Sequence, residues 1–274
     1  MSWFHETLYD SVEHRLRIDR ELHHGNSAYQ EIRIFENNGV GKVLALDGIV
    51  QTTTRDEFIY HEMLTHVPAF GHGGLKRVLI IGGGDGGMLE EVLKHPVERA
   101  VMVELDGEVV RLCREHLPEI CGAAFEDPRT ELIIGDGAAF VGETEERFDL
   151  IITDRPDPVG PAAILFSERF YANCRRCLAP GGVLVTQNGV PFYQGPEVTE
   201  TARHLRGLFA HHGFYVAPVP MYVGGVMAFG WASDALDLAA TTGSDMAGLR
   251  YYTSAVHRAA FALPGYVQDL IDAA

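Results

Sequence analysis

The chain has 274 residues, which allows one large domain or one large and one small domain with a buried core. Apolar residues make up 46% and charged residues 22%, so disordered and fibrous classes are excluded. With 38 Asp and Glu against 22 Lys and Arg, the net charge of −16 argues against binding a nucleic-acid backbone. It suits a cationic partner, although acidic soluble proteins are also common.

The first part of the chain predicts a small antiparallel meander. Short apolar runs at residues 30–35, 42–46 and 49–53 are separated by turn residues, Asn-Asn-Gly at 37–39 and Asp47-Gly48. We therefore expect an N-terminal β-domain over residues 1–54 and a second domain over residues 55–274.

A helix is expected directly after this meander. Thr54 is a suitable cap, and Asp56 and Glu57 place negative charge in the first turn. The apolar residues that follow keep a helical spacing up to Val67, and Pro68 is expected to end the helix.

From Lys76 onward, short aliphatic runs alternate with helical segments. This alternation predicts a Rossmann-like, doubly wound parallel sheet, in which ligands bind beyond the carboxyl ends of the strands. The expected strands are residues 78–81, 100–103, 132–134, 150–153 and 183–186, with helical segments that include 88–94 and 108–116.

One uncharged stretch, residues 213–233, is long enough to imitate a membrane span. Two prolines and a Gly-Gly pair interrupt it, so two buried strands at 214–219 and 226–232 are expected, and no membrane span. Four cysteines without an evident secretory leader predict a reducing, cytoplasmic location. They are Cys113, Cys121, Cys174 and Cys177.

A glycine-rich loop, Gly-Gly-Gly-Asp-Gly-Gly at 82–87, follows the first parallel strand. Its G-x-G-x-x-G spacing lets a ligand approach the backbone at a helix start. Asp85 in the middle of the loop would repel a pyrophosphate by roughly 4 kcal/mol at about 4 Å. The loop therefore favours a neutral or cationic ligand.

Acidic residues also follow the next two strands. Glu104 lies 20 residues after Gly84, where a carboxylate can accept both hydroxyls of a ribose. Asp136 and Gly137 follow the third strand, where a carboxylate can accept from an adenine amino group. Together they outline an adenosine site, and the loop favours an S-adenosyl sulfonium over NAD.

Asp154 directly follows the fourth strand, and Asp157 comes three residues later among three prolines. Two carboxylates in this stiff segment are expected to bind an amine.

Six segments span nearly the whole chain in order: ALDGIVQTT at 45–53, RDEFIYHEM at 55–63, VLIIGGGDGG at 78–87, DPVGP at 157–161, QNGV at 187–190 and AAFALP at 259–264. Together these segments resemble the bacterial spermidine synthases. The resemblance implies an N-terminal β-domain that assists oligomerisation and a Rossmann-like catalytic domain. It also implies aminopropyl transfer from decarboxylated S-adenosylmethionine to putrescine, giving spermidine and 5′-methylthioadenosine. No permanently bound cofactor, metal, nucleic acid or membrane is implied, and the partners are the two small substrates and further copies in a homodimer or homotetramer.

The resemblance also implies roles for single residues. Asp154 would accept the proton, and Asp157 would hold the polyamine. Residues implied for the nucleoside are Gln30, Glu104, Asp136, Gly137 and Pro161; those implied for the aminopropyl or amine chains are Gln51, Tyr60, His61, Asp85 and Tyr222.

Some positions depart from the family pattern. Arg155 and Pro156 stand where small residues are usual, and Ala163 stands where an acid is common. Cadaverine or agmatine therefore stays open as the acceptor, with a small-molecule methyltransferase and a catalytically silent sensor as other readings. Arg155 is expected to point into the site or to turn toward solvent.

Two metal-like patterns are rejected. His61 and His66 miss the zinc-protease spacing by one residue, so their rings are expected to diverge around the helix. Cys174 and Cys177 have no second close cysteine pair and are expected to be ordinary buried thiols.

Overall fold

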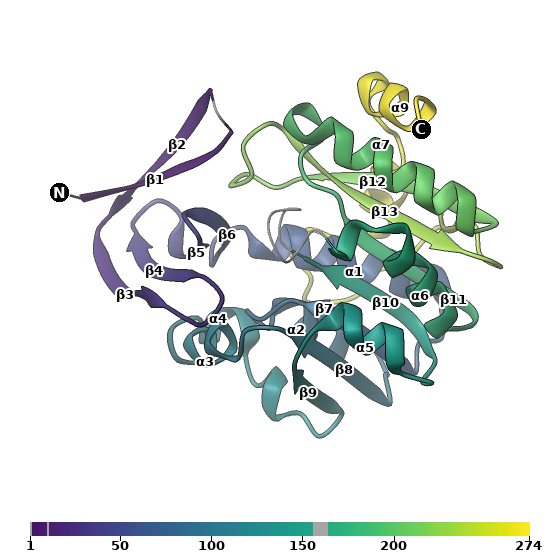
Figure 1. Ribbon diagram of the computed structural model, residues 1–274, viewed down its shortest axis with the longest axis horizontal. Helices are drawn as coiled ribbons and strands as arrows, with labels where there is room; N and C mark the ends of the chain where they lie inside the picture. Colours follow the sequence, from purple (N-terminus) through teal and green to yellow (C-terminus); the bar gives the residue numbers. More distant parts are fainter. Residues whose placement is uncertain (1, 10, 156–163) are drawn as a thin grey trace.

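The computed structural model describes residues 2–9, 11–155 and 164–274. Two antiparallel sheets come first in the chain, and a seven-stranded sheet flanked by helices follows (Figure 1). The first is a hairpin of β1 (Ser2–Tyr9) and β2 (Val12–Ile18). The second has the order β3 (Arg20–Asn26), β4 (Glu31–Asn37), β5 (Gly41–Leu46) and β6 (Ile49–Thr53).

Both faces of the four-stranded sheet are covered. Ile32 and Ile34 of β4 pack with apolar residues of α3 (Gly107–His116). On the other face, Phe35 packs with Phe4 and Leu16 of the hairpin. The meander predicted from 30–53 is confirmed, whereas β1 to β3 were not predicted from the sequence.

Helix α1 (Glu57–His72) has Asp56 rather than Thr54 at its N-cap position and runs through Pro68. The prediction that Pro68 ends the helix was wrong: Pro68 is buried within it, and the helix ends at Gly73, whose φ of 77° provides a left-handed cap. The Asp56 carboxylate accepts from Thr53 Oγ1 at 2.5 Å and from the backbone N–H of Met221 at 2.9 Å.

The opposite side of α1 is bound to a distant part of the chain. The buried Glu62 carboxylate accepts three successive backbone N–H groups, from Arg250, Tyr251 and Tyr252, at 2.7, 2.8 and 2.7 Å. Hydrogen bonds to a carboxylate are among the stronger ones in proteins, so this contact fixes the helix to the C-terminal region.

The large sheet has the strand order β12-β13-β11-β10-β7-β8-β9. Strands β11, β10, β7, β8 and β9 are parallel, and β13 runs antiparallel to both β11 and β12. The strands are β7 (Arg77–Gly82), β8 (Arg99–Glu104), β9 (Thr130–Ile134), β10 (Phe148–Asp154), β11 (Leu178–Gln187), β12 (His211–Pro218) and β13 (Val226–Ser233). The Rossmann-like sheet and the two strands expected in the uncharged stretch are confirmed.

Helices cover both faces of this sheet (Figure 1). Along β7, Val78 and Ile80 pack in one core with α1, while Leu79 and Ile81 pack in another with α6 (Glu168–Cys177). This alternation explains why the strand is apolar throughout. The helices of this region are α2 (Gly87–Leu93), α4 (Pro118–Cys121), α5 (Gly137–Glu143), α6 (Glu168–Cys177), α7 (Pro191–Leu208), α8 (Ser254–Ala260) and α9 (Gly265–Asp272), with 3-10 turns η1 (Ala124–Glu126) and η3 (Leu238–Ala240).

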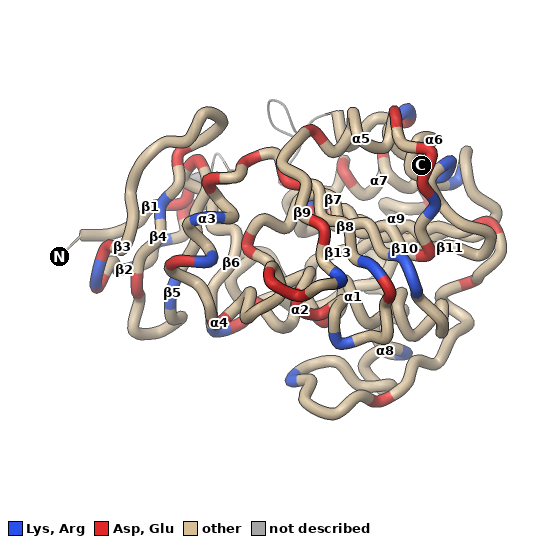
Figure 2. The backbone as a smooth tube through the Cα atoms, turned by 90° about the horizontal axis from the view of Figure 1, so that it is seen from below, with Lys and Arg blue, Asp and Glu red and all other residues tan. Residues whose placement is uncertain are grey.

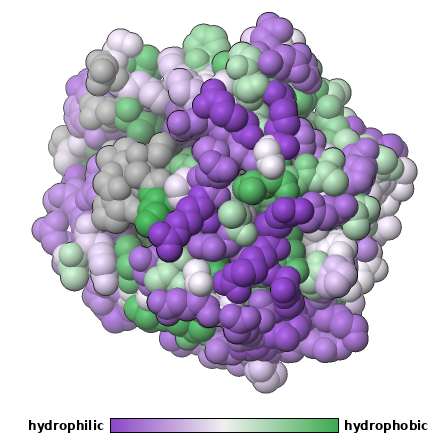
Figure 3. All heavy atoms as spheres, turned by 45° about the vertical axis from the view of Figure 1, so that its right-hand side comes forward, coloured by the Kyte–Doolittle hydropathy of each residue, from purple (hydrophilic) through white to green (hydrophobic). Residues whose placement is uncertain are grey.

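The surface carries the acidic character of the composition. Asp and Glu are spread along most of the chain, whereas Lys and Arg form fewer groups, several near β8, β10 and α6 (Figure 2). The face seen in Figure 3 is mainly hydrophilic with small apolar areas. Among the described residues, no helix is long and apolar enough to cross a membrane.

Candidate active site

Four acidic positions lie beyond the carboxyl ends of adjacent strands. Because β10, β7, β8 and β9 are neighbours in that order, the edge of the sheet presents Asp154, the glycine-rich loop, Glu104 and Asp136 in a row. The placement of these acids at strand ends agrees with the sequence analysis. Parallel strands thus bring together carboxylates that are far apart in the sequence.

The glycine-rich loop passes close to two of these carboxylates. Gly82 and Gly83 have φ values of 86° and 75°, which favour glycine. A Cβ on Gly83 would lie 3.1 Å from Asp154 Oδ2, and one on Gly84 would lie 3.1 Å from Glu104 Oε2. Side chains on this loop would therefore occupy the space beside the acids.

Asp154 has a perturbed environment at the end of β10. Tyr60 Oη donates a hydrogen bond to Asp154 Oδ1 at 2.5 Å. Desolvation and the nearby charge of Asp85 raise the Asp154 pKa to about 6, although His61 and the Tyr60 hydrogen bond oppose the rise. Burial and the charge of Asp154 raise the Tyr60 pKa well above its usual value, so its hydroxyl stays protonated.

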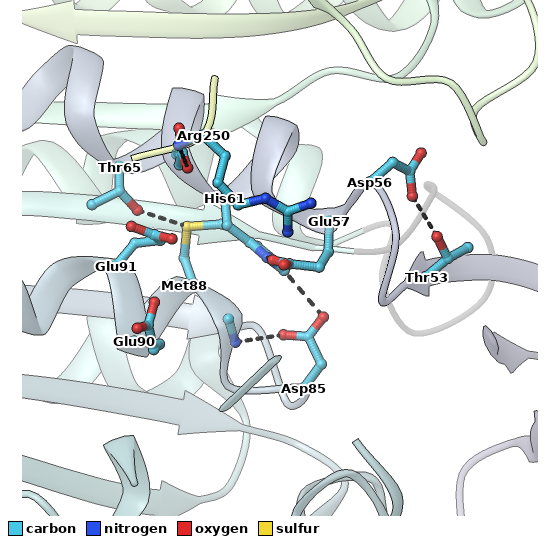
Figure 4. Close-up of polar contacts among 12 residues, drawn as sticks. Thr53, Asp56, Glu57, His61, Thr65, Asp85, Met88, Glu90, Glu91 and Arg250 are labelled. Atoms are coloured by element: carbon cyan, nitrogen blue, oxygen red, sulfur yellow. Dashed lines mark hydrogen bonds and ion pairs between the residues drawn. The ribbon is translucent and has the colours of Figure 1, made fainter. Parts of the chain in front are cut away.

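His61 lies between two carboxylates, as Figure 4 shows. Its Nδ1 is 2.8 Å from Glu57 Oε2, and its Nε2 is 3.5 Å from Asp85 Oδ2. Burial alone would lower the His61 pKa, but these two carboxylates raise it well above the usual value. Asp85 also accepts the backbone N–H of Gly87 at 2.9 Å. The imidazolium therefore holds Asp85 on the α1 side of the loop.

Glu104 is held by backbone groups at the end of β8. It accepts the N–H of Asp106 at 2.8 Å, yet desolvation outweighs this bond and raises the Glu104 pKa to about 7. The neighbouring Asp106 accepts from Ser27 Oγ at 2.6 Å and Gln30 Nε2 at 3.0 Å. Gln30, which follows β3, is thereby brought to the same edge as Glu104.

Asp136 and Gly137 form the start of α5. Asp136 caps this helix by accepting the N–H groups of Ala138 and Ala139 through Oδ1, at 2.7 and 3.2 Å, and its side chain is exposed. A Cβ on Gly137 would lie 2.4 Å from Ile81, so the helix start packs closely on β7.

The remaining described candidates lie near Tyr60. The Tyr222 ring packs edge-on against Tyr60 at 5.9 Å, and its hydroxyl donates to the Gln51 carbonyl at 2.6 Å. The Gln51 amide itself donates to the Ile49 carbonyl at 3.2 Å. Asp157 and Pro161 lie outside the described residues, as do Pro156 and Ala163.

Arg155 takes neither of its two expected orientations. Its side chain is buried, donates to Tyr171 Oη at 2.8 Å and lies over the Phe166 ring. The expectation was wrong because buried polar groups of Tyr171 and Thr186 lie close to the guanidinium. No local sequence pattern indicates these contacts.

The rejected metal patterns have other roles. His61 faces Asp85, whereas His66 is buried against Glu91 and His95 at 2.9 and 2.8 Å. All four cysteines are buried and unpaired. Within the described part of the chain, no cluster of three His, Cys, Asp or Glu side chains is arranged to hold a metal ion.

Two residues of the site were not singled out from the sequence. Glu57 was assigned only to the first turn of the helix, although its i,i+4 spacing to His61 could have indicated the ion pair. Asp106, which binds Gln30, gave no comparable signal, because its partner comes from a separate sheet.

Comparison with known proteins identifies the family. Residues 57–241 match the spermine/spermidine synthase domain, and residues 2–54 match the spermidine synthase tetramerisation domain. The polyamine aminopropyltransferase 1 of Pseudomonas aeruginosa is 54% identical over 99% of this chain and 98% of its own length. The polyamine aminopropyltransferase of Salmonella typhi is 50% identical over 98% of each chain.

Solved structures agree with this result. A spermidine synthase in complex with the transition-state analogue AdoDATO has a TM-score of 0.93 and 38% identity, covering 99% of this chain and 95% of that chain. The spermidine synthase of Thermotoga maritima has a TM-score of 0.91 and 38% identity, with 99% and 94% covered. The chain therefore belongs to the spermidine synthase family of polyamine aminopropyltransferases.

Proposed function

We propose that the protein transfers the aminopropyl group of decarboxylated S-adenosylmethionine to a diamine, with putrescine as the preferred acceptor. Spermidine and 5′-methylthioadenosine would be the products. The observation that carries this proposal is the pairing of Asp154 with Tyr60 beside Asp85, at a sheet edge where the glycine-rich loop passes close to Asp154 and Glu104.

The reaction is a displacement at carbon. The amine lone pair forms a C–N bond to the methylene beside the sulfonium, while the C–S bond breaks and its electron pair returns to sulfur as a neutral thioether. The new ammonium then loses one proton. Because the leaving group is already activated by its charge, the protein's main tasks are alignment and proton removal.

Asp154 is proposed as the proton acceptor. The ammonium form of a diamine has a pKa near that of Lys, roughly 10, so the attacking nitrogen must be in its neutral form when it reacts. The proton that Asp154 accepts is the one that this nitrogen loses once the C–N bond has formed. A carboxylate whose pKa is raised to about 6 is still ionised at neutral pH, yet it binds a proton more strongly than an ordinary aspartate. The hydrogen bond from Tyr60 holds one oxygen, which leaves the other available to the amine.

Asp85 is proposed to select the donor. Its carboxylate would pair with the terminal amine of the decarboxylated donor, whereas ordinary S-adenosylmethionine would bring a second carboxylate into the same region. His61 and Glu57 support this role because they fix the direction of Asp85.

The other predicted residues are assigned to the two substrates. For the nucleoside, we propose that Glu104 accepts from the ribose hydroxyls, together with Asp136, Gly137, Gln30 and Pro161. For the amine chain, we propose Asp157, Gln51, Tyr60, His61 and Tyr222. The contact of Tyr222 with Tyr60 supports the second group.

We also propose that the protein forms a homodimer or homotetramer in the cytoplasm, with residues 1–54 and 55–274 as its two domains. The match of residues 2–54 to a tetramerisation domain supports the oligomer.

The test is a competition between putrescine, cadaverine and agmatine with decarboxylated S-adenosylmethionine, with products identified by mass spectrometry. Formation of methylthioadenosine and spermidine in preference to the other polyamines is expected. A preference for another diamine would reject putrescine, and the absence of methylthioadenosine with every diamine would reject aminopropyl transfer.

A further inference from the structure

Arg155, the residue after the proposed proton acceptor Asp154, has a buried side chain. Arg155 follows Asp154 at the end of β10, and only 2% of its surface is exposed. Its Nη2 donates to Tyr171 Oη at 2.8 Å and lies 3.4 Å from both Thr186 Oγ1 and the Gln187 carbonyl. The side chain thus enters the layer between β11 and α6.

The same guanidinium also contacts Leu165 and Phe166, which precede α6. It donates to the Leu165 carbonyl, and its centre lies 3.4 Å from the centroid of the Phe166 ring. The backbone carbonyl of Arg155 in turn accepts from Gln187 Nε2 at 2.6 Å. One residue therefore connects the end of β10 to β11, to α6 and to the chain before α6.

A network of buried neutral groups supports these contacts. Tyr171 Oη is 3.0 Å from Thr201 Oγ1, which accepts from Asn188 Nδ2 at 2.7 Å. Asn188 Oδ1 accepts from Thr186 Oγ1 at 2.6 Å. These four side chains are nearly inaccessible to solvent, so the position of the guanidinium is defined from several directions.

Burying the Arg155 guanidinium has a free-energy cost. Among the residues that the structure describes, the Nε of Arg155 has no hydrogen-bond partner. Taking a charge out of water is costly, and carbonyl dipoles and an aromatic face compensate it incompletely. The remaining donors of the guanidinium bind the Leu165 carbonyl and the Tyr171 hydroxyl, and these contacts fix its position beside the end of β10.

We propose that Arg155 is a positioning residue for the acceptor side of the active site. By tying the backbone next to Asp154 to Leu165, Phe166 and Tyr171, it fixes the direction of the Asp154 carboxylate toward the bound diamine. This inference rests on the proposed function. It assigns to Arg155 an effect on the amine half-site and none on the nucleoside half-site, which lies across β7 and β8.

The test compares Arg155→Met and Arg155→Lys with the wild type. Steady-state kinetics give kcat and the KM for putrescine, and calorimetry gives the Kd for methylthioadenosine. We expect Arg155→Met to lower kcat/KM for putrescine by about tenfold or more, since a small misplacement of reacting groups is costly. The Kd for methylthioadenosine is expected to stay within about twofold, and thermal melting checks that the variant is folded. Arg155→Lys keeps the charge but not the planar fork, so a loss of similar direction is expected.

Two further variants separate positioning from folding. Tyr171→Phe removes one partner of the guanidinium without changing its charge, and a smaller loss of kcat/KM for putrescine is expected. Arg175→Met is the matched control, because Arg175 pairs with Asp234 and both of these side chains are nearly half exposed. The kinetics of this variant are expected to equal those of the wild type.

The outcomes are distinguishable. An unchanged kcat/KM for putrescine in Arg155→Met, or equal losses in the putrescine and methylthioadenosine measurements, would overturn the inference. If Arg155→Met does not fold, an unchanged kcat/KM for putrescine in Tyr171→Phe would do so instead. A wild-type protein that forms no methylthioadenosine contradicts the proposed function itself, which is a separate result.

Discussion

The raised pKa of Asp154 predicts that the proposed proton acceptor weakens the fold at neutral pH. Burial raises this pKa to about 6 in the folded protein, whereas an ordinary aspartate has a pKa of 3.8. At 1.36 kcal/mol for each unit, the ionised carboxylate costs about 3 kcal/mol of folding free energy above pH 6. Because the folded-state pKa is raised, this group favours the fold most below pH 3.8 and loses that contribution as pH rises through about 6.

Asp154→Asn removes the ionisation while keeping an acceptor for Tyr60. At pH 8 we expect the variant to be more stable than the wild type by up to about 3 kcal/mol, and at pH 4 by much less. Urea denaturation at both pH values measures the difference. Formation of methylthioadenosine should fall steeply in the variant, because no carboxylate remains to take the proton. A variant that is less stable than the wild type at both pH values, or one that keeps full activity, would refute the reasoning.

Three further predictions concern the same site. The activity of the wild type should rise as pH passes about 6, because Asp154 must be ionised to accept a proton; a profile that is flat between pH 5 and 7.5 would contradict this. Binding of methylthioadenosine should release protons near pH 7, because ribose hydroxyls favour the ionised form of Glu104, whose pKa is about 7. Calorimetry in buffers of different ionisation enthalpy measures this release, and Glu104→Gln should abolish it. Gly87→Ala should reduce activity severalfold, because the new Cβ would lie 2.2 Å from the His61 ring, whereas Gly74→Ala, with no atom within 4 Å, is the control and should behave as the wild type.

The sheet edge was predictable because it depends on local patterns. Short aliphatic strands alternating with helices define parallel neighbours, and each acid directly follows a strand. Asp85, Glu104 and Asp154 could therefore be placed at one edge without knowing any long-range contact. The assignment of substrates to these acids came from the family resemblance, and their individual roles stay predictions.

The errors arose where tertiary contacts decide the outcome. Proline usually ends a helix, but Pro68 is buried in the core and α1 continues to Gly73. Strands β1 and β3 mix polar and apolar residues without a clear period, whereas Val12, Leu16 and Ile18 of β2 alternate with charged residues, a local signal that the sequence analysis missed. The burial of Arg155 depends on Tyr171 and Gln187, which are distant in the sequence.

The anchoring of α1 has a consequence for how the enzyme could adapt to different amines. Tyr60 and His61 project from this helix toward the site, while the adjacent Glu62 holds three consecutive peptide N–H groups at residues 250–252. Turning or sliding the helix to admit a longer diamine would break those bonds and leave a buried carboxylate without partners. Changes in acceptor length should therefore arise by substitution of individual side chains on a stationary helix, and directed evolution toward new diamines should leave Glu62 untouched.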